Sequence, residues 1–258
     1  MMVPRTDDLP FPPSVEEFYP PSLIDGAGYW LTKFTLLVWL AVGLIIVFFL
    51  VAYRNPKMVP TRGQWIAETV YGFNRENVAK DLIGHEGIKF APYFTTLFCF
   101  ILLTNLFGII PGIQISPNSH IAFPIVLTAI TYVMFIAVGV RKFGFARYVK
   151  QSLVPAAPWF ILPLLIPIEF FSTFIVRPVT LSLRLFANMF AGHMILLVFI
   201  LGGFVLLNAN VALAPISLLS WLLAIALTFL EALVAILQAY VFVILTSSYV
   251  QGALAEQH

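Results

Sequence analysis

The sequence predicts an all-α polytopic membrane protein with five membrane-crossing helices. Of its 258 residues, 60% are hydrophobic and 10% are charged, and the mean hydropathy is +0.96. Soluble domains have about half apolar and a quarter charged residues, so this chain needs lipid as its solvent. Uncharged runs of about 20 residues are long enough to cross a ~30 Å hydrocarbon core. The net charge of +2 is too small to favour nucleic-acid binding.

The first 30 residues form an acidic, proline-rich tail. A secretory signal has a basic start and an apolar core, and this segment has neither. Arg5 is its one basic residue, against Asp7, Asp8, Glu16, Glu17 and Asp25. We expect residues 1–30 to be an external tail and residues 31–258 to be a single transmembrane helical domain.

Three spans precede the last hundred residues. Residues 34–53 and 121–140 each supply 20 residues without a charge. The run 90–119 is also uncharged, and its Pro111-Gly112 turn signal predicts that the second helix ends near residue 111. Each span must be helical, because lipid offers no partner for an unpaired backbone group.

Basic residues predict the orientation of these spans. The loop before the second span and the loop after the third hold ten of the fourteen basic residues, namely Arg54, Lys57, Arg62, Arg75, Lys80, Lys89, Arg141, Lys142, Arg147 and Lys150. The positive-inside rule places both loops in the cytoplasm and the N-terminus outside. Apolar side chains in the first of these loops predict an amphipathic helix on the inner surface, through Ile66, Val70, Phe73, Val78 and Leu82.

The last two helices are unusually long. Residues 167–207 and 215–250 have a helical pattern and are separated by a turn at 208–214, whereas Pro155, Pro158 and Pro163 interrupt the approach. These helices would be about 60 and 54 Å long, so neither fits upright in the membrane core. We expect a steeply tilted, antiparallel hairpin at 167–250 that carries an ion path.

Ionisable residues inside this hairpin are costly. A charge at the bilayer centre costs about 2.5–3.5 kcal/mol on insertion scales, so it is retained where it faces a water path or a partner. The hairpin holds Glu169, Arg177, Arg184, His193 and Glu231.

Their spacing predicts how they meet. Arg184 and Asn188 share one helix face with Arg177. Folding the hairpin about its turn puts Arg184 level with Gln238 and His193 level with Glu231, while Glu169 lies some 22 Å inward. Glu and His exchange protons near neutral pH, whereas arginine does not deprotonate. We therefore predict a proton path that Arg184 interrupts and that a carboxylate of another chain must bypass.

Three segments carry a family resemblance. RPVTLSLRLFANMFAGH (177–193), TNLFGIIPG (104–112) and FLEALVAILQAYVFVILTSSYV (229–250) are similar to subunit a of F-type ATP synthases. The resemblance implies that Arg184, flanked by Asn188 and Gln238, separates two half-channels beside a rotating ring. It implies an outer half-channel at His193 and Glu231, which some members carry in exchanged positions, and an inner acidic position at Glu169.

The resemblance also implies the function and the partners. The chain would be a non-catalytic stator subunit that passes protons to and from carboxylates of a c-subunit ring, so that proton flow drives rotation and ATP synthesis. The other partners would be peripheral-stalk b subunits and, indirectly, the F1 sector. No cofactor or metal site is expected, because the chain has neither a Cys/His cluster nor a nucleotide loop. The location would be a bacterial plasma membrane, with the mitochondrial inner membrane as the alternative.

Other interpretations stay open at this point. A secondary transporter would show paired halves with matching broken helices. A structural membrane subunit would not need an arginine level with a Glu/His pair. Polar side chains can also join helices by hydrogen bonds, which is our reading of Asn105. Arg177 is either an orienting charge at the interface or a part of the path. Ion choice between proton and sodium resides largely in the ring.

Overall fold

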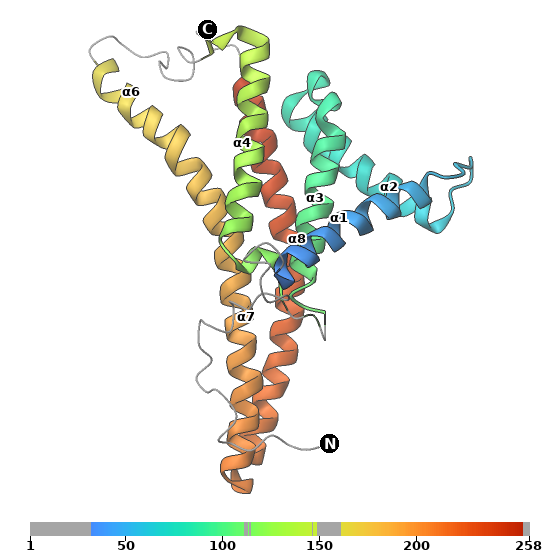
Figure 1. Ribbon diagram of the computed structural model, residues 1–258, viewed down its shortest axis with the longest axis vertical. Coiled ribbons are helices and arrows are strands. Elements are labelled where there is room, and N and C mark those ends of the chain that lie inside the picture. Colours follow the sequence, from blue (N-terminus) through green and yellow to red (C-terminus); the bar gives the residue numbers. More distant parts are fainter. Residues whose placement is uncertain (1–31, 111–112, 114, 146, 149–160, 255–258) are drawn as a thin grey trace. The chain divides into compact units, whose positions relative to one another are not determined.

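The computed structural model describes residues 32–110, 113, 115–145, 147–148 and 161–254, and within these ranges the chain is helical without strands (Figure 1). In the described part of the chain, five helices are long and apolar enough to cross a membrane: Lys33–Ala52, His85–Leu106, Ala122–Phe143, Leu162–Ala209 and Ala214–Leu254. The predicted all-α class and the five crossings are confirmed. The acidic tail lies outside the described residues.

Helices α1 and α4 agree with the predicted spans. α1 covers Lys33–Ala52, within one residue of the prediction at each end. α4 covers Ala122–Phe143 and continues beyond residue 140, because Arg141 and Lys142 in its last turn interact favourably with the helix dipole. It ends at Gly144, which has a positive φ of 81° that glycine adopts without strain.

The second span, α3, covers Ala91–Leu106 and ends earlier than predicted. The sequence placed its end near Pro111, but polar side chains beyond the helix stop it first. Ser116 Oγ donates to the carbonyl of Thr104 at 3.0 Å. Asn118 Nδ2 donates to Thr104 Oγ1 at 2.9 Å and to Asn105 Oδ1 at 2.7 Å. Asn105 therefore holds the helix end to the following loop.

The loop between the first two spans contains the expected helix, in two parts. α2 covers Arg62–Phe73 and a π-helical segment, η4, covers Asn74–Ile83. The Phe73 ring lies 5.6 Å from that of Tyr240, and Ser247 Oγ donates to the carbonyl of Val78 at 3.2 Å. The C-terminal half of this helical segment thus packs along another helix, whereas Ile66 stays exposed.

The fourth crossing is one continuous helical stretch of three segments. α6 covers Leu162–Phe171, the π-helical η7 covers Ser172–Val176, and α7 covers Arg177–Ala209. It begins five residues before the predicted start at 167, because Pro163 falls in the first helical turn, where proline is tolerated. The π turn directly precedes Pro178, whose ring would clash with a carbonyl in a regular helix. At 48 residues the stretch is about 72 Å long.

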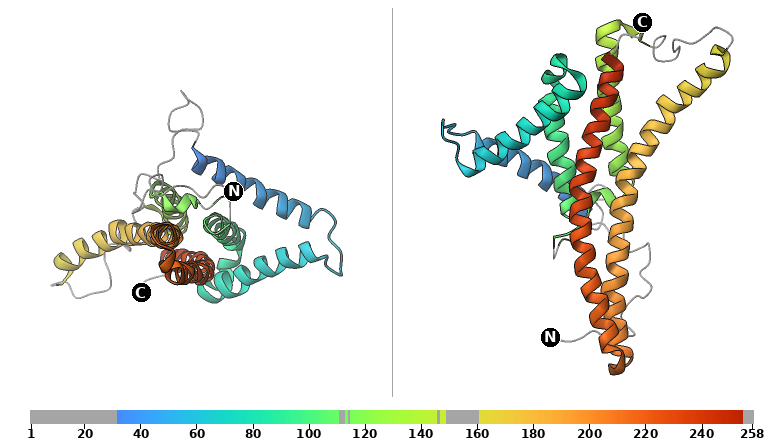
Figure 2. Two further views of the ribbon diagram at one scale, coloured as in Figure 1. Left: turned by 90° about the horizontal axis from the view of Figure 1, so that it is seen from below. Right: turned by 180° about the vertical axis from the view of Figure 1, so that it is seen from behind.

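The fifth crossing, α8, covers Ala214–Leu254 and follows the short turn η8, Val211–Leu213. Next to this turn, α7 and α8 run antiparallel and side by side (Figures 1 and 2). Ser217 Oγ donates to the carbonyl of Gly203 at 2.6 Å, and Ser220 Oγ donates to that of Phe199 at 2.7 Å. Two residues at the same height on α7 and α8 thus have residue numbers that add up to about 420 near the turn. This is close to the register that the hairpin geometry predicted.

Contacts divide the chain into two compact units. The first holds Met1–Leu40, Leu102–His120 and Leu185–Leu237, and the second holds Ala41–Ile101, Ile121–Arg184 and Gln238–His258. In the second unit, the ends of three crossings meet at Lys142. Its Nζ donates to Glu86 Oε2 at 3.3 Å, before α3, and to the carbonyl of Leu254 at 3.1 Å, at the end of α8. The start of the second crossing and the ends of the third and fifth therefore lie together within the second unit.

Candidate proton-translocation site

Arg184 lies near the middle of the helical stretch Leu162–Ala209 and points away from the packed side of α7. Leu181, Leu185 and Met189 are buried on that packed side, whereas Arg184 is exposed beside Leu183, which is 44% exposed. Within the described ranges the Arg184 guanidinium has no hydrogen-bond or ion-pair partner, including Gln238. Within the part of the chain that the structure describes, this permanent cation thus lies beside apolar side chains with no carboxylate that neutralises it.

Arg177, two turns away on the same helix, has partners within the chain. Its Nη2 lies 3.8 Å from Glu169 Oε1, and its guanidinium lies 5.8 Å from the centroid of the Tyr249 ring. Thr173 Oγ1 donates to the same Glu169 oxygen at 3.3 Å. The structure therefore brings Glu169 and Arg177 together in one half-exposed cluster. Arg177 thus has an ion-pair partner and an aromatic neighbour within the chain.

Glu231 belongs to the first unit, where it faces α7. Its side chain is buried, with 6% exposed, and its Oε2 accepts no hydrogen bond from the described residues. The neighbouring position on α7 is Gly192: a Cβ built there would lie 2.9 Å from Glu231 Oε1. His193, the next residue, is half-buried. The structure thus places Glu231 at the level of the Gly192-His193 pair, as the register predicted.

Asn188 and Gln238 occupy different environments. Asn188 is exposed on α7, one helical turn from Arg184, so it shares the exposed face. Gln238 is buried in α8, with 4% of its surface exposed. Both belong to the predicted site.

Sequence reasoning missed two neighbours of the site. Tyr249 contacts Arg177 from α8 and lies eleven residues beyond Gln238, which is about three turns along one helix face. That spacing, together with its level relative to Arg177, would have identified it. Gly192 gives no such signal, because only the built helix pair shows that it makes room for a carboxylate.

The chemistry that these groups offer is proton exchange beside a fixed charge. Glu169, Glu231 and His193 can gain and lose protons, and Arg184 and Arg177 stay positive. In the part of the chain that the structure describes, no group of three His, Cys, Asp or Glu side chains could hold a metal ion.

Comparison with known proteins decides the family. Residues 35–251 match the family described as ATP synthase A chain. The chain belongs to this family. It is 48% identical over 231 residues to the ATP synthase subunit a of Nocardioides sp., covering 88% of this chain and 83% of that protein. It is 44% identical over 264 aligned positions to the subunit a of Pseudarthrobacter chlorophenolicus, covering 100% and 99% of the two chains. The Streptomyces lividans subunit a is 42% identical over 240 residues.

Membership of the ATP synthase A chain family gives this protein its general role. It is a membrane-spanning subunit of the Fo sector, acting in ATP synthesis and ion transport alongside other subunits. These relatives are bacterial, and with the five apolar helices they support a bacterial membrane location.

Proposed function

We propose that this chain is the proton-channel stator subunit of a rotary ATP synthase, with Arg184 separating two half-channels. The observation that carries the proposal is the exposed Arg184 guanidinium, which no described residue of the chain neutralises. A cation in lipid is retained where it faces a partner or a water path. The partner that fits is a carboxylate on a ring of c subunits, which Arg184 keeps ionised as it passes.

The two half-channels load and unload that carboxylate. His193 and Glu231 supply the outer side, where Glu231 Oε2 has an open acceptor position. Glu169, held by Arg177, supplies the inner side. Asn188 and Gln238 flank Arg184 with neutral polar groups. A ring carboxylate takes a proton outside, turns through lipid while neutral, and releases the proton inside, driven by about 2.3 kcal/mol per charge per 100 mV.

Membership of the family supports our proposal for the rest of the assembly. The chain itself carries out no reaction on nucleotide and acts as a non-catalytic subunit. Peripheral-stalk b subunits hold it against rotation, and the F1 sector, reached only indirectly, makes ATP. We propose residues 31–258 as one transmembrane domain with the external tail 1–30, in a bacterial plasma membrane.

Photo-crosslinking tests the partner directly. A photoreactive amino acid replaces Leu183, which lies beside Arg184 and is exposed, in the intact complex. We expect crosslinks to the c subunit. The matched control is Val47 on α1, 57% exposed, which should crosslink to lipid or to other chains and not to the ring. Ring crosslinks from Val47 and none from Leu183 would contradict the proposal.

A further inference from the structure

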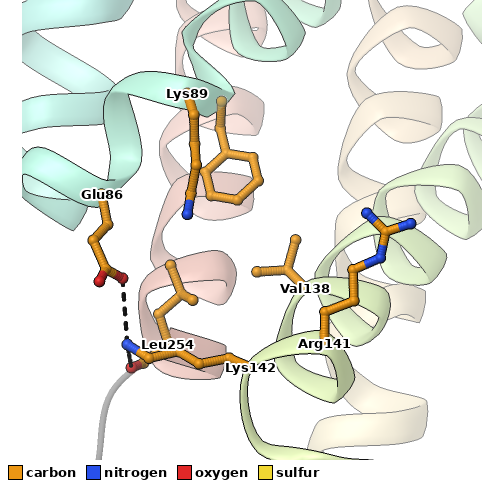
Figure 3. Close-up of a pocket in the computed structure, with 7 residues that line it drawn as sticks. Glu86, Lys89, Val138, Arg141, Lys142 and Leu254 are labelled. Carbon is orange, nitrogen blue, oxygen red and sulfur yellow. Dashed lines mark hydrogen bonds and ion pairs between the residues drawn. The ribbon is translucent and has the colours of Figure 1, made fainter.

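A cationic pocket lies where the ends of three crossings meet in the second unit, and none of the residues that line it belongs to the proposed proton path. It has a volume of about 370 Å³, and seven residues from the second unit line it, namely Glu86, Lys89, Phe90, Val138, Arg141, Lys142 and Leu254 (Figure 3). They come from the 3-10 helix η5 (His85–Phe90), from the last turns of α4, and from the end of α8. The pocket therefore sits at the ends of three predicted crossings.

The charges in this pocket are unbalanced. Lys142 is the cation that the protein neutralises, through Glu86 at 3.3 Å, and it also donates to the Leu254 carbonyl. Arg141 has no hydrogen bond or ion pair among the described residues, and Lys89 contacts only the Phe90 ring, 5.5 Å from its centroid. Figure 3 shows Lys89 and Arg141 on different helices with Val138 drawn between them, and its dashed lines mark both bonds of Lys142. Among the described residues, Lys89 and Arg141 thus have no anionic partner.

The rest of the lining is apolar. Phe90, Val138 and Leu254 contribute hydrocarbon surface beside the two cations. A free inorganic anion gains nothing from such a surface, whereas a membrane lipid has a phosphate group joined to apolar chains. Arginine also offers a planar set of donors that matches two phosphate oxygens at once. Basic pockets between crossings on the inner side of a membrane suit anionic head groups.

We propose that this pocket binds the phosphate group of an anionic membrane lipid, with Arg141 and Lys89 as its ligands. The positive-inside prediction puts this surface in the inner leaflet. The lipid phosphate lies between Arg141 and Lys89, and its acyl chains run along Val138 and Phe90 towards the membrane core. Bound there, the lipid would tie η5, α4 and α8 together at the inner surface.

A photoactivatable phosphatidylglycerol tests this site in the intact complex. Labelled peptides are mapped by mass spectrometry, and we expect labelling at residues 85–90 and 138–142. Unlabelled phosphatidylglycerol should compete, whereas phosphatidylcholine and inorganic phosphate at equal phosphate concentration should not. Competition by inorganic phosphate as strong as by the lipid would identify a free-anion site and overturn the proposal.

Variants separate the pocket from general surface charge. The double substitution Lys89→Gln with Arg141→Gln should lower labelling of these peptides at least about tenfold, because each basic residue near a membrane contributes to anionic-lipid binding. The matched control, Arg54→Gln with Lys57→Gln, removes two exposed cations that do not line the pocket and should leave the labelling unchanged. Glu86→Gln removes the ion pair of Lys142 and should therefore raise the labelling.

Other results would overturn the proposal. Equal loss of labelling in the pocket variant and the control would show a nonspecific surface effect. Crosslinking of residues 138–142 to another subunit, with no lipid label there, would show that an acidic protein segment fills the pocket. If the double variant fails to assemble, the Glu86→Gln variant still decides, because it should raise the labelling and not lower it. Unchanged or lower labelling in Glu86→Gln would then contradict the proposal.

Discussion

Arg177 and Arg184 are seven residues apart on one helix, yet the surroundings of their guanidinium groups differ. Arg177 has a carboxylate at 3.8 Å and an aromatic ring at 5.8 Å, whereas Arg184 has no hydrogen-bond or ion-pair partner among the described residues. An ionised group in a membrane is retained where it faces a partner or a water path. Arg177 has such partners within the chain, and we propose that Arg184 finds its partner on another chain.

At the same scale, His193 and Glu231 should act as one unit. We expect that exchanging them, by His193→Glu with Glu231→His, restores more proton-driven ATP synthesis than either single substitution retains. The reason is that both groups exchange protons and lie at one level of the hairpin. The measurement is ATP synthesis in vesicles carrying each variant. A double variant no better than the worse single one would rule out direct coupling.

Gly192 should set the position of the Glu231 carboxylate. Gly192→Ala puts a methyl group 2.9 Å from Oε1, and the carboxylate, as the end of a flexible side chain, moves away. Misplacing a reacting group by about 1 Å can cost up to about 100-fold in rate, so we expect proton-driven ATP synthesis to fall about tenfold. Complex assembly should be unaffected.

The control for this substitution is Gly43→Ala, since no atom lies within 4 Å of a Cβ at that position. Activity there should stay at the wild-type level. If Gly192→Ala lost no activity while Gly43→Ala did, the close approach of Gly192 and Glu231 would not matter for transport.

At the scale of the elements, the π turn η7 keeps Glu169 and Arg177 on one face. Eight residues separate them, which in a regular α-helix would put them about 80° apart. A π turn absorbs one extra residue and removes most of that angle. Deleting Ile175, an exposed residue of the turn, should therefore leave a regular helix with the pair still facing.

We expect the Ile175 deletion to keep more ATP synthesis than the deletion of Leu197, which lies in the regular part of α7. Removing Leu197 rotates the part of α7 that follows it relative to the part that precedes it. The contact of Gly203 with Ser217 and that of Gly192 with Glu231 then cannot both form. Assembly and ATP synthesis of both variants are measured together. Equal losses would show that the π turn does not absorb a residue.

The features of the elements that the sequence predicted correctly follow from periodicity. The five crossings and the register of α7 with α8 follow from apolar run length and from helix geometry, and both agree with the structure. The end of α3 does not follow from them, because Ser116 and Asn118 reach back over more than ten residues to bind Thr104 and Asn105. The start of α6 was wrong because Pro163 was read as a breaker, although proline is tolerated in a first turn. The site roles stay predictions from residue type, spacing and family resemblance, whereas the exposure of Arg184 needs coordinates.

At the scale of the whole molecule, five crossings predict that the two termini lie on opposite sides of the membrane. The bonds from Lys142 to Glu86 and to the Leu254 carbonyl join the start of the second crossing to the ends of the third and fifth, as an alternating path of crossings requires. Single cysteines at Asp25 and at Glu256 should therefore be labelled from opposite sides of the membrane, the first from outside. A membrane-impermeant thiol reagent applied to intact cells and to inverted vesicles measures this. The same accessibility at both positions would refute the topology.

The central claim is that the permanent charge of Arg184 forces a ring carboxylate to release its proton and keeps the two half-channels apart. ATP synthesis and passive proton flux, measured together in vesicles that contain the whole complex, test it most directly. Arg184→Ala should abolish proton-driven ATP synthesis, because no cation then ionises the carboxylate, while passive proton flux persists or rises. Arg184→Lys should also be severely impaired, because a lysine ammonium is a compact charge that loses its proton far more easily than a guanidinium. Near-normal ATP synthesis in Arg184→Ala would contradict the mechanism.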